Sequence, residues 1–234
     1  MSFHTIEPTI EIPHISVANV PAVSILAAGE FPKVGSLGAD ILAACYARGD
    51  RHLVCCDGAF DKLQRAGYSL PDAVVGDMDS ISQENLRLLG ERVHRDPDQE
   101  TNDLTKTVCF VRRKYAPSSL CILGLTGLRE DHTLGNIALL PTYVRGGIDL
   151  LIAPTPYGCL FAFEGTALIH GQAGRQVSIF DFYRSAISTQ GLRWELNNRV
   201  LSELWMGTLN RMEGDRFLIS SSKPIVLSLQ NEIK

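Results

Sequence analysis

Short apolar runs alternate with helical segments over the first two-thirds of this chain, and this alternation constrains its fold more than any other feature. The β-type runs are residues 23–27, 52–56, 73–75, 120–123 and 149–153. The segments between them with helical spacing are residues 39–47, 60–66, 81–89, 104–115 and about 131–144, with Ser80 as the expected N-cap of the third. Strictly alternating strands and helices predict a parallel sheet with helices on both faces.

The pattern changes after about Pro156. The remaining β-type runs (167–170, 176–181 and 226–229) are short, and Gly, Asn and Ser separate them. No segment there has convincing helical spacing, which favours a small antiparallel β domain. We therefore predict an α/β fold in which residues 1–155 form a Rossmann-like, three-layer domain with a parallel sheet. An all-β sandwich domain over residues 156–234 follows it.

The composition is that of a folded soluble protein with a sizeable core: 234 residues, 45% hydrophobic and 21% charged. The net charge of −4 and the lack of a dense basic run argue against long nucleic acids as partners. The first 20 residues lack the pattern of a signal peptide, and no apolar run reaches the ~18 residues of a membrane span. Six cysteines without a C-x-x-C pair are expected to be mostly buried, reduced thiols, so we expect a cytoplasmic protein.

Acidic side chains are concentrated where an apolar run ends. Asp77 and Asp79 directly follow the strand 73–75, and Asp103 opens a helix shortly afterwards. The carboxyl ends of strands in α/β sheets are where ligands bind, and crowded carboxylates need a cation such as Mg²⁺. In extended backbone the first two carboxylates would face the same way, although a turn is an equally good interpretation of this segment.

Two further segments belong to the same predicted edge of the sheet. Asp57 also ends a strand, where it serves either the site or the N-cap of the helix 60–66. The loop 124–132 contains two glycines and Arg129, and both features suit phosphate oxygens. We expect His132 to be a surface or capping residue.

The β-rich half contains one notable segment, residues 188–194, which ends in Trp194. A tryptophan ring can offer its flat face to an aromatic or cationic ligand, but packing in the sandwich core is the alternative. Trp205 is expected in the core. No motif of covalent catalysis or of zinc binding is present.

Taken in order, these motifs resemble those of the thiamine pyrophosphokinases. The similarity extends from about Val23 to Leu229 and is most specific in the G-D-x-D-S and R-x-D-H-T-L-x-N elements. The matching segments are 29–32, 57–58, 76–80, 98–106, 127–136 and 188–194. The chain departs from the usual sequence mainly at nucleotide-side positions, which are Ala28, Ala59, Phe60, Asp61, Asn102 and Leu128.

The resemblance implies an α/β catalytic domain, a β-sandwich, and a homodimer with active sites between the subunits. It implies Mg²⁺-dependent transfer of pyrophosphate from ATP, the co-substrate, to the hydroxyl of thiamine, giving thiamine diphosphate and AMP. The implied metal ligands are Asp77, Asp79 and Asp103, and the further catalytic positions are Asp57, Arg129 and Asp131. The implied substrate contacts are Gln99, Asn102, Ser188 and Trp194.

We expect in-line attack at the β-phosphorus, with the protein supplying position and charge neutralisation. Either Asp57 or Asp131 could orient or deprotonate the alcohol, and the sequence does not choose between them. Two other functions stay open. The chain could be another Mg²⁺-dependent, nucleotide-using phosphotransferase or phosphohydrolase, or a non-catalytic protein that binds a small molecule.

Overall fold

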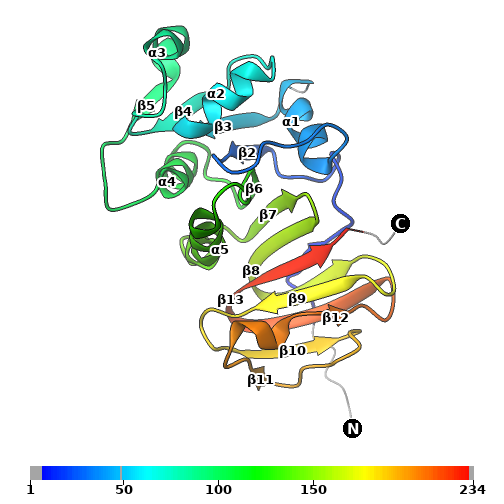
Figure 1. Ribbon diagram of the computed structural model, residues 1–234. Helices are drawn as coiled ribbons and strands as arrows, with labels where there is room; N and C mark the ends of the chain where they lie inside the picture. Colours follow the sequence, from blue (N-terminus) through cyan, green and yellow to red (C-terminus); the bar gives the residue numbers. More distant parts are fainter. Residues whose placement is uncertain (1–6, 48, 232–234) are drawn as a thin grey trace.

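The structure is a computed structural model that describes residues 7–47 and 49–231 (Figure 1). Its five α-helices are α1 (Leu37–Ala47), α2 (Asp57–Arg65), α3 (Gln83–Leu89), α4 (Asp103–Tyr115) and α5 (Glu130–Arg145). Two short 3-10 helices, η1 (Gly90–Arg92) and η2 (Leu204–Gly207), accompany them. The strands are β1 (Ile10–Ile12), β2 (Val23–Leu26), β3 (His52–Cys56), β4 (Ala73–Gly76), β5 (Val93–Arg95), β6 (Ser119–Leu123), β7 (Leu150–Thr155), β8 (Gly158–His170), β9 (Gln176–Phe180), β10 (Ala186–Gln190), β11 (Arg199–Val200), β12 (Asn210–Arg211) and β13 (Arg216–Gln230).

All thirteen strands belong to one hydrogen-bonded sheet. Its path runs β11-β10-β13-β8-β7-β6-β2-β3-β4-β5, and every pair from β7 to β5 is parallel. Strand β8 then pairs antiparallel with β7 and with β13, so the sheet continues without a break into the β-rich half. The fold is therefore a mixed α/β structure built on one large sheet.

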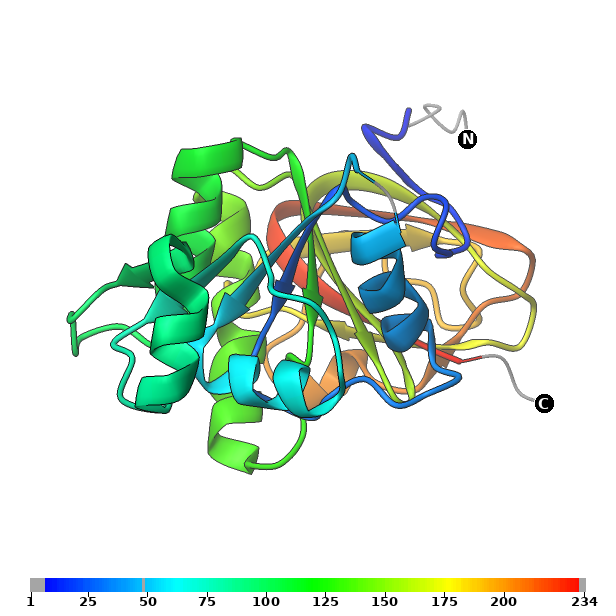
Figure 2. The ribbon, with the colours of Figure 1, turned by 90° about the horizontal axis from the view of Figure 1, so that it is seen from above.

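Helices cover both faces of the parallel part (Figure 2). One face carries α4 and α5, whose buried side chains pack against alternate strand residues such as Cys56. The other face carries α1 and α2, which pack against the residues in between, such as Cys55. This alternation follows from the two-residue repeat of a strand, and it explains why these strands are apolar on both sides.

Strands β8 and β13 hold the β-rich half together. Phe161, Phe163 and Leu227 point into the core of the β-rich half, to which Ile12 of β1 and Ile152 of β7 also contribute. Ala162 and Val226 point the opposite way, into the core beneath α5. Strands β8 and β13 therefore contribute side chains to both cores, and they join the β-rich half to the α/β half. A separate sandwich and a division at residues 155/156 stay predictions from the sequence.

Most predicted elements are confirmed, with shifts of a few residues at their ends. The N-cap prediction for α3 is wrong: Ser82, not Ser80, accepts a hydrogen bond from the backbone N–H of Asn85, at 3.2 Å. Strand β5 was not predicted, because its three residues include His94 and Arg95 and carry no apolar pattern. Strands β8 and β13 are much longer than predicted, because polar residues interrupt their apolar runs.

The prediction that Trp205 lies in the core is also wrong. Its side chain, in the 3-10 helix η2, is 73% exposed. The cysteine prediction is confirmed for the described residues, since five of the six are buried and none forms a disulfide, with Cys109 exposed. Among residues 7–47 and 49–231, no helix has the length and hydrophobicity needed to cross a bilayer. The first six of the 20 residues considered for a signal peptide lie outside the described range.

Candidate active site

The parallel sheet has a topological switch point between β2 and β6. From β2 the chain adds β3, β4 and β5 on one side, and β6 then returns to the other side of β2. In open α/β sheets ligands bind at the carboxyl ends of the strands at such a point. A cavity of about 280 Å³ lies there, bordered by the residues that follow β2, β3 and β6 and by the start of α4. A smaller cavity of about 130 Å³ adjoins it and shares Leu125.

Asp57 lies at the buried edge of the larger cavity. It is the first residue of α2, follows β3 directly and is only 1% exposed. One carboxylate oxygen accepts a hydrogen bond from the backbone N–H of Gly58, and the other from that of Met78, at 3.1 Å. A Cβ atom on Gly76 would come within 2.7 Å of the Asp57 carboxyl carbon, so only glycine lets the end of β4 approach this closely.

The segment from Asp77 to Asp79 is a turn. Met78 has a left-handed backbone conformation, with φ of 69°, and the backbone N–H of Asp79 donates to Oδ1 of Asp77 at 3.0 Å. The expectation of extended backbone with both carboxylates facing the same way is therefore wrong, and the alternative of a turn is correct. Asp79 is exposed at this turn, while Oδ2 of Asp77 accepts a hydrogen bond from Nε2 of Gln99 at 3.3 Å.

Asp103 is the first residue of α4, and Asn102 is the N-cap of that helix. Oδ1 of Asn102 accepts hydrogen bonds from the backbone N–H and the hydroxyl of Thr105, at 2.9 and 2.7 Å. Its amide donates to the side chain of Asn136 on α5 at 3.2 Å. The N-cap thereby ties the start of α4 to α5 and fixes the position of the Asp103 carboxylate at the mouth of the cavity.

Three carboxylates approach one another at this edge of the sheet. Burial, and next the negative charge of Asp103 within hydrogen-bond reach, raise the pKa of Asp57 to about 7. Asp77 also adds to this rise, although its own pKa is lowered by the hydrogen bonds from Asp79 and Gln99. A cation would stabilise this concentration of negative charge.

The carboxylate oxygens of Asp57, Asp77 and Asp103 are ligands that suit a hard divalent cation, but they do not form a complete coordination shell. Within the described ranges, no group of three or more His, Cys, Asp or Glu side chains is arranged to hold a metal ion. The predicted site of Asp77, Asp79 and Asp103 is thus not preformed. Mg²⁺ is commonly held by one or two carboxylates, with substrate phosphates completing the shell, and Asp57, Asp77 and Asp103 suit that mode.

The loops after β2 and β6 form the opposite wall. The backbone N–H of Gly29 donates to the carbonyl of Gly124 at 2.9 Å, and a Cβ on Gly29 would lie 2.3 Å from that oxygen. Leu128 has a φ of 70°, a conformation that glycine adopts at little cost. Arg129 and Asp131 form a two-bond pair, with N–O distances of 3.1 and 2.5 Å, and both side chains are exposed. That pair lowers the pKa of Asp131 to about 2.

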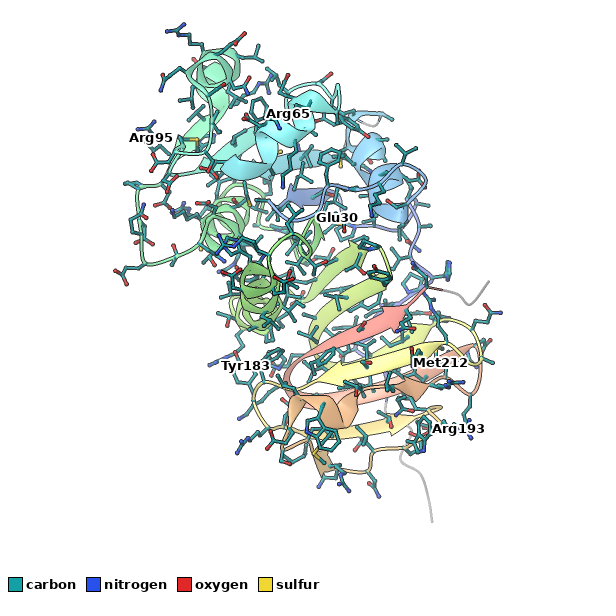
Figure 3. The ribbon with its side chains drawn as sticks, in the orientation of Figure 1. Glu30, Arg65, Arg95, Tyr183, Arg193 and Met212 are labelled. Atoms are coloured by element: carbon teal, nitrogen blue, oxygen red, sulfur yellow. The ribbon has the colours of Figure 1, made fainter. Side chains whose placement is uncertain are left out.

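Ser188 and Trp194 lie in the β-rich half, far from these loops. Figure 3 shows Arg193, the neighbour of Trp194, near the end of the molecule opposite the α/β half, whereas Glu30 lies beside the cavities. The Trp194 side chain is 55% exposed, so the alternative of core packing is wrong. The hydroxyl of Ser188 accepts a hydrogen bond from the backbone N–H of Asn198 at 2.9 Å. Within one chain these two residues do not meet the carboxylates.

Two lysines near the cavity received no role from the sequence. Nζ of Lys62 donates to the carbonyls of Ala28 and Gly29, at 2.6 and 2.9 Å, and thereby holds the loop after β2. Lys106 is buried, with Nζ 3.3 Å from Oδ1 of Asp103. The sequence could have indicated the contact between Lys106 and Asp103, because residues three positions apart on a helix are neighbours on its surface.

Comparison with known proteins gives the family. Residues 45–152 match the model described as thiamin pyrophosphokinase, catalytic domain, and residues 158–227 match that family's substrate-binding domain. The chain is 31% identical over 180 residues to "Thiamine pyrophosphokinase 1" of Oryza sativa subsp. japonica, covering 69% of this chain and 67% of the relative. The chain belongs to the thiamine pyrophosphokinase family.

Other relatives agree with this assignment. "Thiamine pyrophosphokinase 3" of the same plant is 32% identical over 146 residues, which cover 56% of this chain and 54% of that relative. The crystal structure of yeast thiamin pyrophosphokinase superposes with a TM-score of 0.77 at 16% identity, covering 98% of this chain and 93% of the other. For the enzyme from Candida albicans the TM-score is 0.75 at 17% identity, over 99% and 95%. At these identities the structures support the fold alone.

Proposed function

We propose that this chain transfers the pyrophosphoryl group of ATP to the hydroxyl of thiamine, giving thiamine diphosphate and AMP. The observation that carries the proposal is the match of both halves to the two domains of one kinase family. The position of Asp57, Asp77 and Asp103 at the switch point of the sheet supports it, because polyphosphate substrates arrive with a divalent cation.

We further propose that Mg²⁺ is held by Asp77 and Asp103, with Asp57 beside them and Asp79 closing over the exposed side. The ion would neutralise charge on the polyphosphate. Arg129 stands at the mouth of the same cavity, where its guanidinium group can stabilise charge on the transferred group. Gln99 positions the Asp77 carboxylate, and Asn102 positions the start of α4.

The two candidates for the proton acceptor differ in their surroundings. Both carboxylate oxygens of Asp131 accept hydrogen bonds from Arg129, and its pKa of about 2 makes it a poor base. Asp57 is buried at the cavity, and a pKa of about 7 is close to the value that suits a general base at neutral pH. We therefore assign to Asp57 the role of orienting the thiamine hydroxyl and accepting its proton.

Thiamine requires a second surface, and we propose that a second copy of the chain supplies it. Ser188 and Trp194 would contact the vitamin from the partner of a homodimer, with active sites between the subunits. The β-rich half exposes several large apolar side chains that a second copy of the chain could cover. These are Trp194, Val200, Leu204, Trp205 and Leu209.

We also infer that the chain divides near residue 155 into a Rossmann-like catalytic domain (1–155) and a thiamine-binding β-sandwich (156–234). The separate matches to residues 45–152 and 158–227 support this division. A cytoplasmic location, without nucleic acid or membrane partners, stays the prediction from composition.

Incubation of the full chain with ATP, Mg²⁺ and thiamine tests the proposal directly. We expect chromatography to show AMP and thiamine diphosphate in equal amounts, and neither product without Mg²⁺. Hydrolysis of ATP without thiamine diphosphate would indicate a phosphohydrolase instead. Binding of thiamine with no turnover of nucleotide would indicate a non-catalytic binding protein.

A further inference from the structure

Lys106 is a buried charge beside the candidate active site. It is the fourth residue of α4, at the end of the first turn, and only 3% of its side chain is exposed. Removing an ammonium group from water costs several kcal/mol unless a nearby opposite charge compensates it. A lysine is therefore buried this deeply only where its charge has a counterpart.

That counterpart is Asp103. Nζ of Lys106 lies 3.3 Å from Oδ1 of Asp103, and among the described residues Asp103 is the one that accepts a hydrogen bond from it. The charge of Lys106 also acts on two other acidic segments. Hydrogen bonds are the main cause of the lowered pKa values of Asp77 and Asp98, and the charge of Lys106 is a smaller cause. One ammonium group thus acts on carboxylates from three separate segments.

Two other cationic side chains near the cavity contact groups other than the carboxylates of Asp57, Asp77 and Asp103. Lys62 donates to two backbone carbonyls of the loop after β2. Arg129 is exposed and paired with Asp131. Arg51, the other buried cation, donates to carbonyls of the segment before β2, including that of Val17 at 2.6 Å. Lys106 is the buried cation that faces the carboxylates.

We propose that Lys106 is a positioning residue whose buried ammonium group holds Asp103 in place and compensates the carboxylates of the site while no divalent cation is present. The inference rests on the proposed function for its metal, but it concerns the metal-free protein. Asp57, Asp77 and Asp103 repel one another, and a fixed internal cation keeps them close until the substrate's own cation arrives. Asp103 is then already in place when Mg²⁺ and the substrate phosphates arrive and complete the site.

Thermal unfolding with and without the metal tests this role. We expect Lys106→Met to lower the melting temperature by roughly 5–10 °C in buffer with a chelator, because it leaves a carboxylate cluster without its cation. Millimolar Mg²⁺ alone, compared with NaCl at the same ionic strength, should recover at least about half of that loss, since it replaces the missing charge. Lys106→Arg keeps the charge, so its response to Mg²⁺ should equal that of the wild type.

A packing defect behaves differently, and Val111→Ala on the same helix provides the control. Val111 is fully buried and uncharged, so its truncation should lower the melting temperature equally with and without Mg²⁺. If Lys106→Met behaves like this control, Lys106 has only a packing role and the proposal is overturned.

A double variant covers the case in which Lys106→Met does not fold. Asp103→Asn/Lys106→Met removes both charges, and we expect it to fold and to be more stable than Lys106→Met alone. A double variant that also fails to fold, in Mg²⁺ as well, overturns the pairing. Because none of these measurements needs turnover, an inactive protein that shows the expected melting pattern would contradict the proposed function alone.

Discussion

The two regions assigned to the substrates differ in how complete they are within one chain. On the nucleotide side Asp57 is 1% exposed, and backbone N–H groups from two segments hold its carboxylate. On the thiamine side Trp194 and Trp205 are 55% and 73% exposed. A single chain can fix a cluster of charges, because its own backbone supplies the donors. A flat binding face for a ring needs a second surface opposite it.

The largest expected effect comes from the nucleotide side. Asp77→Asn should lower kcat by roughly 100-fold or more at saturating Mg²⁺, because it removes a charge that acts on the polyphosphate. The fold should persist, since the asparagine can still accept the hydrogen bond from Asp79. Asp149→Asn, an exposed acid outside the site, is the matched control and should keep full activity. Near-normal turnover of Asp77→Asn would refute the assignment of the site.

Mixing two variants that are each impaired at a different region tests whether the two regions come from different chains. Asp77→Asn and the double variant Ser188→Ala/Trp194→Ala, unfolded and refolded together in equal amounts, should regain about a quarter of wild-type activity at low thiamine. Half of the dimers are then mixed, and one of their two sites carries no substitution. A mixture of Asp77→Asn with Asp103→Asn should recover nothing, because both changes lie on the same side. No recovery in the first mixture would show that each site lies within one chain.

A smaller effect is expected on the thiamine side. Trp194→Ala should raise the KM for thiamine about 5- to 30-fold, since contact between its ring and a cationic ligand ring is worth about 1–2 kcal/mol in a desolvated site. The KM for ATP should not change, and Trp194→Phe should restore most of the loss. If the thiamine KM of the alanine variant stays at the wild-type value, the ring does not touch the vitamin.

The last effect is one of stability rather than of activity, and it depends on pH. The folded pKa of Asp57, about 7, exceeds its ordinary value of 3.8, so between these pH values the folded state binds more protons than the unfolded state. The stability that this difference contributes is fully present below pH 3.8 and is lost as the pH rises through about 7. In metal-free buffer at pH 8, Asp57→Asn should therefore unfold at a higher temperature relative to the wild type than it does at acid pH, because it cannot carry the charge.

The control for this measurement is the same comparison at pH 4. There the carboxyl group is protonated in the folded protein, so the relative gain of the variant should be absent, and the variant should be the less stable protein because its amide nitrogen cannot accept the second backbone N–H bond. A gain that does not vary with pH would mean that Asp57 is not the group whose ionisation destabilises the metal-free site.

Periodicity and turn chemistry predicted most of the α/β half. Strand β3 has its predicted bounds, and α4 begins one residue earlier than predicted, with its expected N-terminal segment. The predictions of secondary structure and burial failed where the pattern of apolar and polar residues does not match the burial of the segment. Strand β5 is an edge strand with little buried surface, and β13 continues through polar residues where its register shifts, between Ser221 and Ile225. Trp205 shows that hydrophobicity alone does not determine burial.

The sequence by itself determined which carboxylates lie at the ligand-binding edge, because strand ends and helix starts are set by local pattern. It also placed Trp194 in the half that the family uses for its substrate. Only the tertiary structure decided that Asp57 and Asp103 lie within reach of each other, that Asp79 turns outward, and that Lys106 is buried among the acids. Those outcomes depend on a left-handed turn at Met78 and on the packing of α4 against the sheet. Both bring together residues far apart in the chain, and no local pattern records which of them will meet.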